Sequence, residues 1–163
     1  MKDGLLDVRT FVIPSAIIAE TIGFLRTVGT RGNEGFVLWS GVRTSPQSFR
    51  FASVLIPEQR AMVTEHGLLV TVEGEALFHV NKAVHERNEV LAAQVHTHPT
   101  SAYHSSTDDT FPLVTLVGAL SIVLPDFARK APRDIDRWAW YRLSKRAKWE
   151  PTSTNTKIEI ETE

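Results

Sequence analysis

The segment Val95–Thr110, with the sequence V-H-T-H-P-T-S-A-Y-H-S-S-T-D-D-T, decides how the rest of the chain is interpreted. His96 and His98 are two positions apart, so on an extended strand both rings point to the same face. Seven residues separate His98 from Ser106, and Asp109 follows three positions after that serine. We therefore expect a strand that ends at two histidines and a turn that returns a carboxylate toward them.

These residue types are ones that bind zinc. Two imidazoles and a carboxylate are ligands that Zn²⁺ accepts, and a catalytic zinc usually takes three protein ligands and leaves its fourth position to water. His96, His98 and Asp109 would supply three ligands to one zinc ion. The alternative is simpler, because a His-x-His pair taken alone is more often two polar residues at the end of a strand.

The spacing of these residues resembles the motif of the JAMM (JAB1/MPN/Mov34) metalloproteases, H-x-H-x7-S-x-x-D. That family also has a glutamate far upstream, followed by glycine and hydrophobic residues. This chain has such a segment at Asn33–Trp39, with the sequence N-E-G-F-V-L-W. The resemblance covers roughly residues 10 to 145.

The resemblance implies a role for each residue of the motif. His96, His98 and Asp109 would bind the zinc ion, and Glu34 would act as general base and carry the proton to the leaving amine. Ser106 would donate a hydrogen bond to the tetrahedral oxyanion. No cysteine is present, which excludes a thiolate ligand and a cysteine nucleophile.

Each of these roles has a structural alternative. Asp108 competes with Asp109, since Ser105–Asp108 also reads S-x-x-D, although the seven-residue spacer favours Asp109. Glu34 alone would be a surface residue at a helix end, and Ser106 alone a helix cap. The other histidines lack such spacing and are expected in the core or on the surface, with His104 a candidate for the cleft wall: His66, His79, His85 and His104.

Composition limits the possible partners and location. The 163 residues suit a single domain, expected over residues 1–150 and followed by a polar, acidic tail at 151–163. A net charge of −1 argues against a nucleic-acid or anionic membrane partner. The start of the chain lacks the apolar region of a signal peptide, and the longest apolar run, Leu113–Leu124, is too short to span a bilayer. We therefore expect a cytoplasmic protein.

Apolar periodicity indicates strands interleaved with two helices, and so an α/β (α+β) layered domain. Strands are expected at residues 8–13, 35–41, 49–56, 90–97, within 114–124 and at 138–143, with helices at 14–26 and 76–88. Residues 61–72 are ambiguous, and the tail is expected to be mobile, although K-I-E-I-E at 157–161 alternates like an edge strand. The resemblance implies a curved, mostly antiparallel or mixed sheet flanked by helices, an MPN (JAB) or cytidine-deaminase-like core.

The function implied by the resemblance is a zinc-dependent isopeptidase, similar to a deubiquitinase, that cleaves the amide bond after the C-terminus of a ubiquitin-like protein. Short bacterial members occur with E1-like and E2-like enzymes, including in antiviral gene clusters, so these are expected partners. Phe49–Ile56 is a candidate edge strand for the substrate's extended tail. Two alternatives remain open: a non-catalytic MPN scaffold, and a hydrolase acting on sulfur-carrier or small amino-acid adducts.

Overall fold

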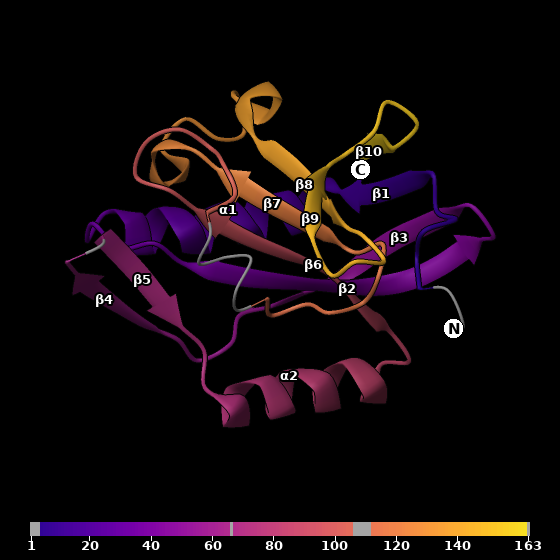
Figure 1. Cartoon of the computed structure of the whole chain (residues 1–163), viewed down its shortest axis with the longest axis horizontal. Helices are drawn as coiled ribbons and strands as arrows, with labels where there is room; N and C mark the ends of the chain where they lie inside the picture. Colours follow the sequence, from indigo (N-terminus) through magenta and orange to yellow (C-terminus); the bar gives the residue numbers. More distant parts are fainter. Residues whose placement is uncertain (1–3, 66, 106–111, 163) are drawn as a thin grey trace.

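A mixed sheet of eight strands, in the order β10-β1-β3-β2-β6-β7-β8-β9, forms the centre of the molecule (Figure 1). The computed structural model describes residues 4–65, 67–105 and 112–162. The strands of this sheet are β1 Thr10–Pro14, β2 Phe36–Ser45, β3 Ser48–Leu55, β6 Val90–Thr97, β7 Leu120–Leu124, β8 Ala139–Leu143, β9 Trp149–Pro151 and β10 Lys157–Glu161. A separate hairpin pairs β4, Arg60–Thr64, with β5, Gly67–Thr71.

Two helices, α1 at Ser15–Gly29 and α2 at Gly74–Glu86, belong to two different hydrophobic clusters. Side chains alternate along β2, so Val37 and Trp39 pack in the cluster of α1, whereas Leu38 packs in the cluster of α2. The helices therefore cover opposite faces of the sheet. This mixed sheet with a helix on each face confirms the predicted α/β class. No helix among the described residues has the length and apolar character needed to cross a bilayer.

β6 occupies an interior position that determines where its polar residues lie. It pairs antiparallel with β2, with Phe36 opposite His96, and parallel with β7, with His96 beside Val123. Its bounds, Val90–Thr97, are those expected from the sequence. Ala93 and Val95 pack in the cluster of α1, so the alternating residues Gln94 and His96 face the α2 side of the sheet.

Several elements differ from the expected bounds. β2 continues to Ser45 instead of ending at Gly41, because its second half pairs with the start of β3. Most of the ambiguous residues 61–72 lie in two paired strands, β4 and β5. The expected strands within 114–124 reduce to β7 alone, since Gly118 adopts a φ of +85° just before it. A Cβ at Gly118 would come within 2.5 Å of the backbone of Leu5 and Leu6, so a glycine is needed where the chain passes this segment. The chain turns at Gly118, and the strand begins only after it.

The expectation of a mobile C-terminal tail is wrong for Lys157–Glu161. These residues form β10, which pairs in parallel along the whole of β1, from Thr10 to Pro14. Ile158 packs against the large core cluster, while Lys157 and Glu159 point outward. The alternation of K-I-E-I-E was therefore the better guide, because it marks a half-buried strand at the edge of a sheet.

The expected edge position of Phe49–Ile56 is wrong for the first part of that segment. β3 lies between β1 and β2, and β1 pairs with Ser48–Arg50. The register with β1 ends there, and for the remaining Phe51–Leu55 the described residues provide a strand partner on the β2 side alone. The second half of β3 therefore presents one open side.

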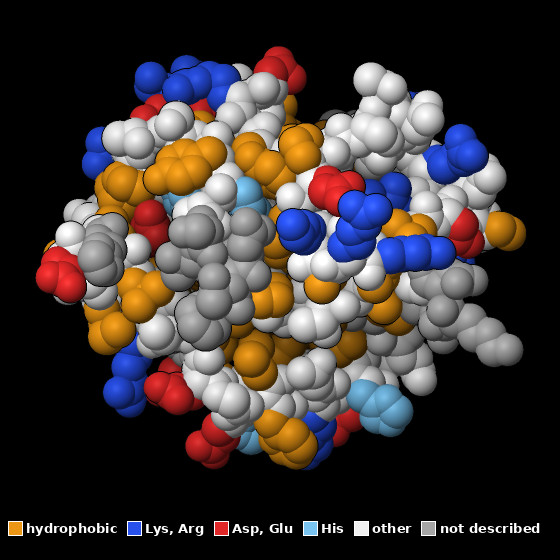
Figure 2. Space-filling model, viewed as in Figure 1, with side chains coloured by type: hydrophobic (Ala, Val, Ile, Leu, Met, Phe, Trp, Pro, Cys, Tyr) orange, Lys and Arg blue, Asp and Glu red, His pale blue; other side chains and the backbone are white. Residues whose placement is uncertain are grey.

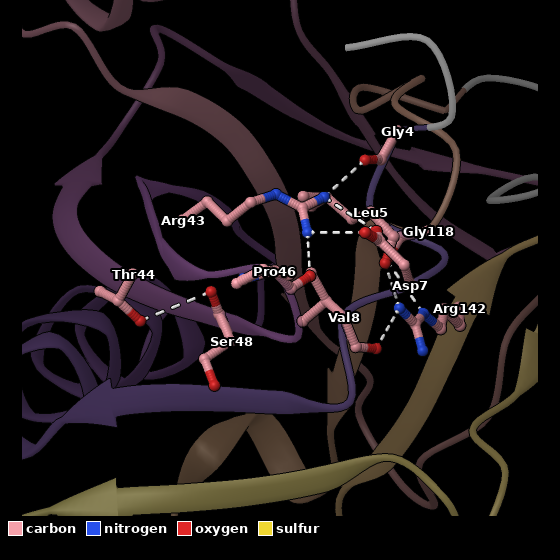
Figure 3. Close-up of polar contacts among 10 residues, drawn as sticks. All are labelled: Gly4, Leu5, Asp7, Val8, Arg43, Thr44, Pro46, Ser48, Gly118 and Arg142. Carbon is pink, nitrogen blue, oxygen red and sulfur yellow. Dashed lines mark hydrogen bonds and ion pairs between the residues drawn. The ribbon is translucent and has the colours of Figure 1, made fainter.

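An arginine on β8 holds the N-terminal segment against the sheet. The Arg142 guanidinium donates to the carbonyls of Gly118, Leu5 and Val8 (Figure 3). It also lies over the Phe11 ring. Burial lowers the pKa of Arg142. Nearby, Arg43 forms a two-pronged ion pair with Asp7, at 2.9 and 3.0 Å, and its guanidinium lowers the pKa of that carboxyl.

Replacing Arg142 should destabilise the protein. Arg142→Met leaves three carbonyls without their charged donor, so we expect a loss of about 2–4 kcal/mol in the free energy of unfolding, measured by urea titration. Arg50→Met is the matched control, because Arg50 forms an exposed ion pair with Glu161 and should cost at most about 1 kcal/mol. Equal losses for the two variants would contradict the role assigned to Arg142.

Candidate functional site

The end of β6 brings His96 and His98 together on one side of the chain. Their ring centroids are 5.1 Å apart, and the residues are 1% and 5% exposed. The two rings therefore lie next to each other, as a spacing of two on an extended strand predicts. The His98 N–H donates to the Leu124 carbonyl at the end of β7, which keeps the chain extended beyond the last residue of β6.

The segment that carries Glu34 runs alongside this pair. Phe36 is opposite His96 in the β2–β6 register, and its ring stacks on the His96 ring with centroids 4.7 Å apart. The Gly35 N–H donates to the Thr97 hydroxyl at 3.4 Å. If this antiparallel register is continued, the backbone of Glu34 falls opposite His98, and its side chain is half-buried.

Close packing against α1 explains why Glu34 is followed by a glycine, Gly35. A Cβ at Gly35 would lie 2.7 Å from a methyl carbon of Val28 and 3.2 Å from a methyl carbon of Leu25, both on α1. A larger residue here would push against these side chains, so glycine lets the chain pass close to α1 before it enters β2. The Glu-Gly pair in the sequence therefore places the glutamate where the chain turns into the strand beside the histidines.

Three further polar residues surround the site, and the sequence analysis did not single out Gln94 or Ser121. His104 Nε2 lies 3.0 Å from the Ser121 hydroxyl, and the Gln94 amide donates to the same hydroxyl at 3.2 Å. The His104 and His96 ring centroids are 6.1 Å apart, so His104 lies beside the histidine pair. The available signal was one polar residue inside an apolar run on each of two strands, A-A-Q-V and L-S-I-V.

This polar group also holds the chain on both sides of residues 106–111. The Gln94 carbonyl oxygen accepts hydrogen bonds from the backbone N–H groups of Leu113 and Val114, at 3.0 and 3.1 Å. On the other side, the His104 N–H donates to the Tyr141 hydroxyl. His104 and Leu113 are thus both hydrogen-bonded to the Gln94–Ser121 pair, which lies two residues from His96 along the strands.

Ser106 and Asp109, together with the competing Asp108, lie outside the described residues. Within the part of the chain that the structure describes, no three His, Asp or Glu side chains are placed to hold a metal ion. His96 and His98 supply two adjacent, buried nitrogen donors that suit zinc. The third ligand expected from the sequence, Asp109, and its competitor Asp108 both belong to residues 106–111, outside the described part of the chain.

Two of the remaining histidines, His79 and His85, lie on α2, away from this centre. His79 and His85 are exposed on α2, where His79 lies 3.9 Å from Glu75, one helical turn away. His66 lies outside the described residues. The structure thus brings together His96, His98 and His104, with the Glu34 segment beside them.

Comparison with known proteins finds relatives both in sequence and in fold. No protein-family model matches the chain. A solution structure of protein DSY2949 from Desulfitobacterium hafniense superposes with a TM-score of 0.65 over 94% of both chains at 14% identity, a likeness of fold alone. The "Probable metalloprotease y4jG" of Sinorhizobium fredii is 42% identical over 146 residues, which cover 90% of this chain and 89% of the relative. The chain therefore belongs to the same family as this probable metalloprotease.

Proposed function

We propose that the protein is a zinc-dependent peptidase of the JAMM type, with one zinc ion held by His96, His98 and Asp109. The observation that carries the proposal is the adjacent, buried His96–His98 pair with the Glu34 segment in register beside it. Membership in the family of a probable metalloprotease supports the same class of chemistry. Two histidines that were merely surface residues at the end of a strand would be exposed. His96 and His98 are instead only 1% and 5% exposed.

In the proposed reaction, each residue of the motif has a separate chemical role. Bound zinc would supply a Lewis acid that lowers the pKa of a water molecule to about 7. The Glu34 carboxylate takes a proton from the attacking water and later gives it to the leaving nitrogen. The Ser106 hydroxyl donates a hydrogen bond to the carbonyl oxygen as negative charge develops there.

The proposed substrate is the amide bond after the extended C-terminus of a ubiquitin-like protein. The open side of Phe51–Leu55 can accept such a tail as an added strand. A groove of about 520 Å³ continues from the end of β3 between the β4–β5 hairpin and α2. Gln59 lines this groove and bonds both the N–H and the carbonyl of Phe36, whose ring stacks on His96.

The proposed substrate implies further partners, and it also gives a test that distinguishes this proposal from its alternatives. E1-like and E2-like enzymes that attach the same ubiquitin-like protein would be partners in the cytoplasm. A non-catalytic scaffold would leave every fusion intact, with or without a chelator. A hydrolase for sulfur-carrier or small amino-acid adducts would cleave only those, so a panel of fusions to different ubiquitin-like tails distinguishes the three.

Glu34→Gln should abolish turnover and keep the metal. The amide cannot take the proton, so cleavage of a ubiquitin-like fusion should fall by about 10²–10⁴-fold. Zinc content, measured by inductively coupled plasma spectrometry, should equal that of the wild type. Glu20→Gln, at an exposed position on α1, is the matched control and should remain fully active. An active Glu34→Gln enzyme would remove the assignment of the base.

Substitutions of the ligands should instead remove the metal. His98→Ala should lose bound zinc, while His79→Ala, on the exposed face of α2, should retain it. Asp109→Asn should weaken zinc binding much more than Asp108→Asn, because the amide is a far poorer ligand than the carboxylate. The reverse order for the two aspartates would show that Asp108 is the third ligand.

A further inference from the structure

A basic hollow of about 750 Å³ lies between α1 and residues 129–137. These residues follow one short 3₁₀ helix, η1 at Asp126–Ala128, and end with a second, η2 at Ile135–Arg137. Lys and Arg side chains gather over this segment at the upper left of the space-filling view (Figure 2). Most of its lining side chains are cationic, and one is acidic. The cations are Arg26, Arg129, Lys130, Arg133 and Arg137, and the acid is Asp134.

The hollow is fixed to the loop that follows the histidine pair. The Phe127 N–H donates to the carbonyl of His98 at 2.9 Å, and the Asp126 N–H donates to the carbonyl of Thr100 at 2.8 Å. Asp126, Phe127 and Ala128 all have φ between 52° and 59°, a conformation that L-residues adopt rarely and at a cost of about 1–3 kcal/mol each. Arg129 is the first residue after this left-handed turn.

Two of the five cations are occupied by the fold. The Arg26 guanidinium donates to the carbonyls of Ala128 and Ala131, which ties α1 to the segment. Arg137 lies 3.4 Å from the Asp126 carboxylate and 3.9 Å from that of Asp134. Asp134 also accepts from the Trp138 indole, so the one acid in the hollow is itself engaged.

The other three cations, Arg129, Lys130 and Arg133, point their charge at solvent. All three are exposed, and none has a carboxylate within ion-pair distance among the described residues. The Arg129 guanidinium lies over the Phe127 ring, 5.5 Å from its centroid, which orients it without neutralising it. The hollow therefore offers three positive charges that have no ion-pair partner among the described residues, and two backbone hydrogen bonds link the turn before it to His98 and Thr100.

We propose that this basic hollow binds an acidic segment of the protein substrate, on the side of the target that leaves with the amine. As a statement about substrate, the inference rests on the proposed peptidase function. Carboxylates match the guanidinium groups of Arg129 and Arg133. Nucleic acid fits less well, because Asp134 and Asp136 interrupt the cations and the chain carries a net charge of −1.

A binding titration tests the hollow directly. A fluorescein-labelled peptide of about ten glutamates is titrated with the full chain, and anisotropy reports binding at low and at physiological salt. Replacing Arg129, Lys130 and Arg133 together by glutamine should weaken binding about tenfold or more, and added salt should weaken wild-type binding. The matched control replaces three exposed cations of the β8–β9 turn by glutamine: Lys145, Arg146 and Lys148.

Three results would overturn the proposal. Equal losses in the two triple variants would show general attraction rather than a site. Equal binding of a glutamine peptide of the same length would show that charge is irrelevant. Tighter binding of an oligothymidylate, lost only when Arg129, Lys130 and Arg133 are replaced, would show a nucleic-acid surface instead.

The titration is independent of the peptidase assignment. Binding requires neither metal nor turnover, so the Glu34→Gln protein should bind the glutamate peptide as the wild type does. For cleavage, fusions with an acidic or a neutral segment after the scissile bond are compared. The hollow variant should lose kcat/KM for the acidic fusion alone. An equal loss for both fusions would contradict docking of an acidic target, even if the peptide binds.

Discussion

The pairing register of β6 is the constraint on which the site depends. Antiparallel hydrogen bonds to β2 place Phe36 opposite His96, and parallel bonds to β7 place Val123 beside it. A slip of one residue would exchange the two faces, turning His96 into the apolar cluster of α1 and Val95 toward the cleft. The buried valines and alanines of β6 therefore hold the imidazoles in place as firmly as any polar contact does.

The hydrogen-bonded pair of Gln94 on β6 and Ser121 on β7 also favours this pairing register over others. Burying an amide and a hydroxyl inside a sheet is costly unless their hydrogen bonds are made. Here the Gln94 amide donates to Ser121 and its oxygen accepts two backbone N–H groups, from Leu113 and Val114. A slip of one residue would move Gln94 to the opposite face and separate it from Ser121. The same bonds fasten the chain after residues 106–111 beside the histidines.

Local patterns in the sequence predicted the parts of the molecule that depend on local physics. The bounds of β6, the two helices and the adjacency of His96 and His98 follow from apolar periodicity and from the alternation of side chains along a strand. The α/β class followed from the order of these elements, whereas the MPN-type core and the zinc ligand Asp109 still rest on the resemblance of the motif.

Features that depend on distant partners were not predictable in the same way. β10 exists because β1 offers it an edge, and β3 is interior at Ser48–Arg50 because β1 joins it there. The sequence D-F-A contains no glycine or asparagine to indicate a left-handed turn at Asp126–Ala128. Gln94 and Ser121 appear in the sequence as isolated polar residues, and only the pairing of their strands reveals what they do.

The parallel pairing of β1 with β10 has a consequence for the newborn chain. β1 leaves the ribosome early, whereas the strand that covers its outer edge is synthesised after almost all the rest of the sheet. Until then β1 shows a row of unsatisfied amide and carbonyl groups, which can recruit a strand from another nascent chain. Chaperone binding during translation would shield this edge, and premature termination before Lys157 would leave a product prone to aggregation.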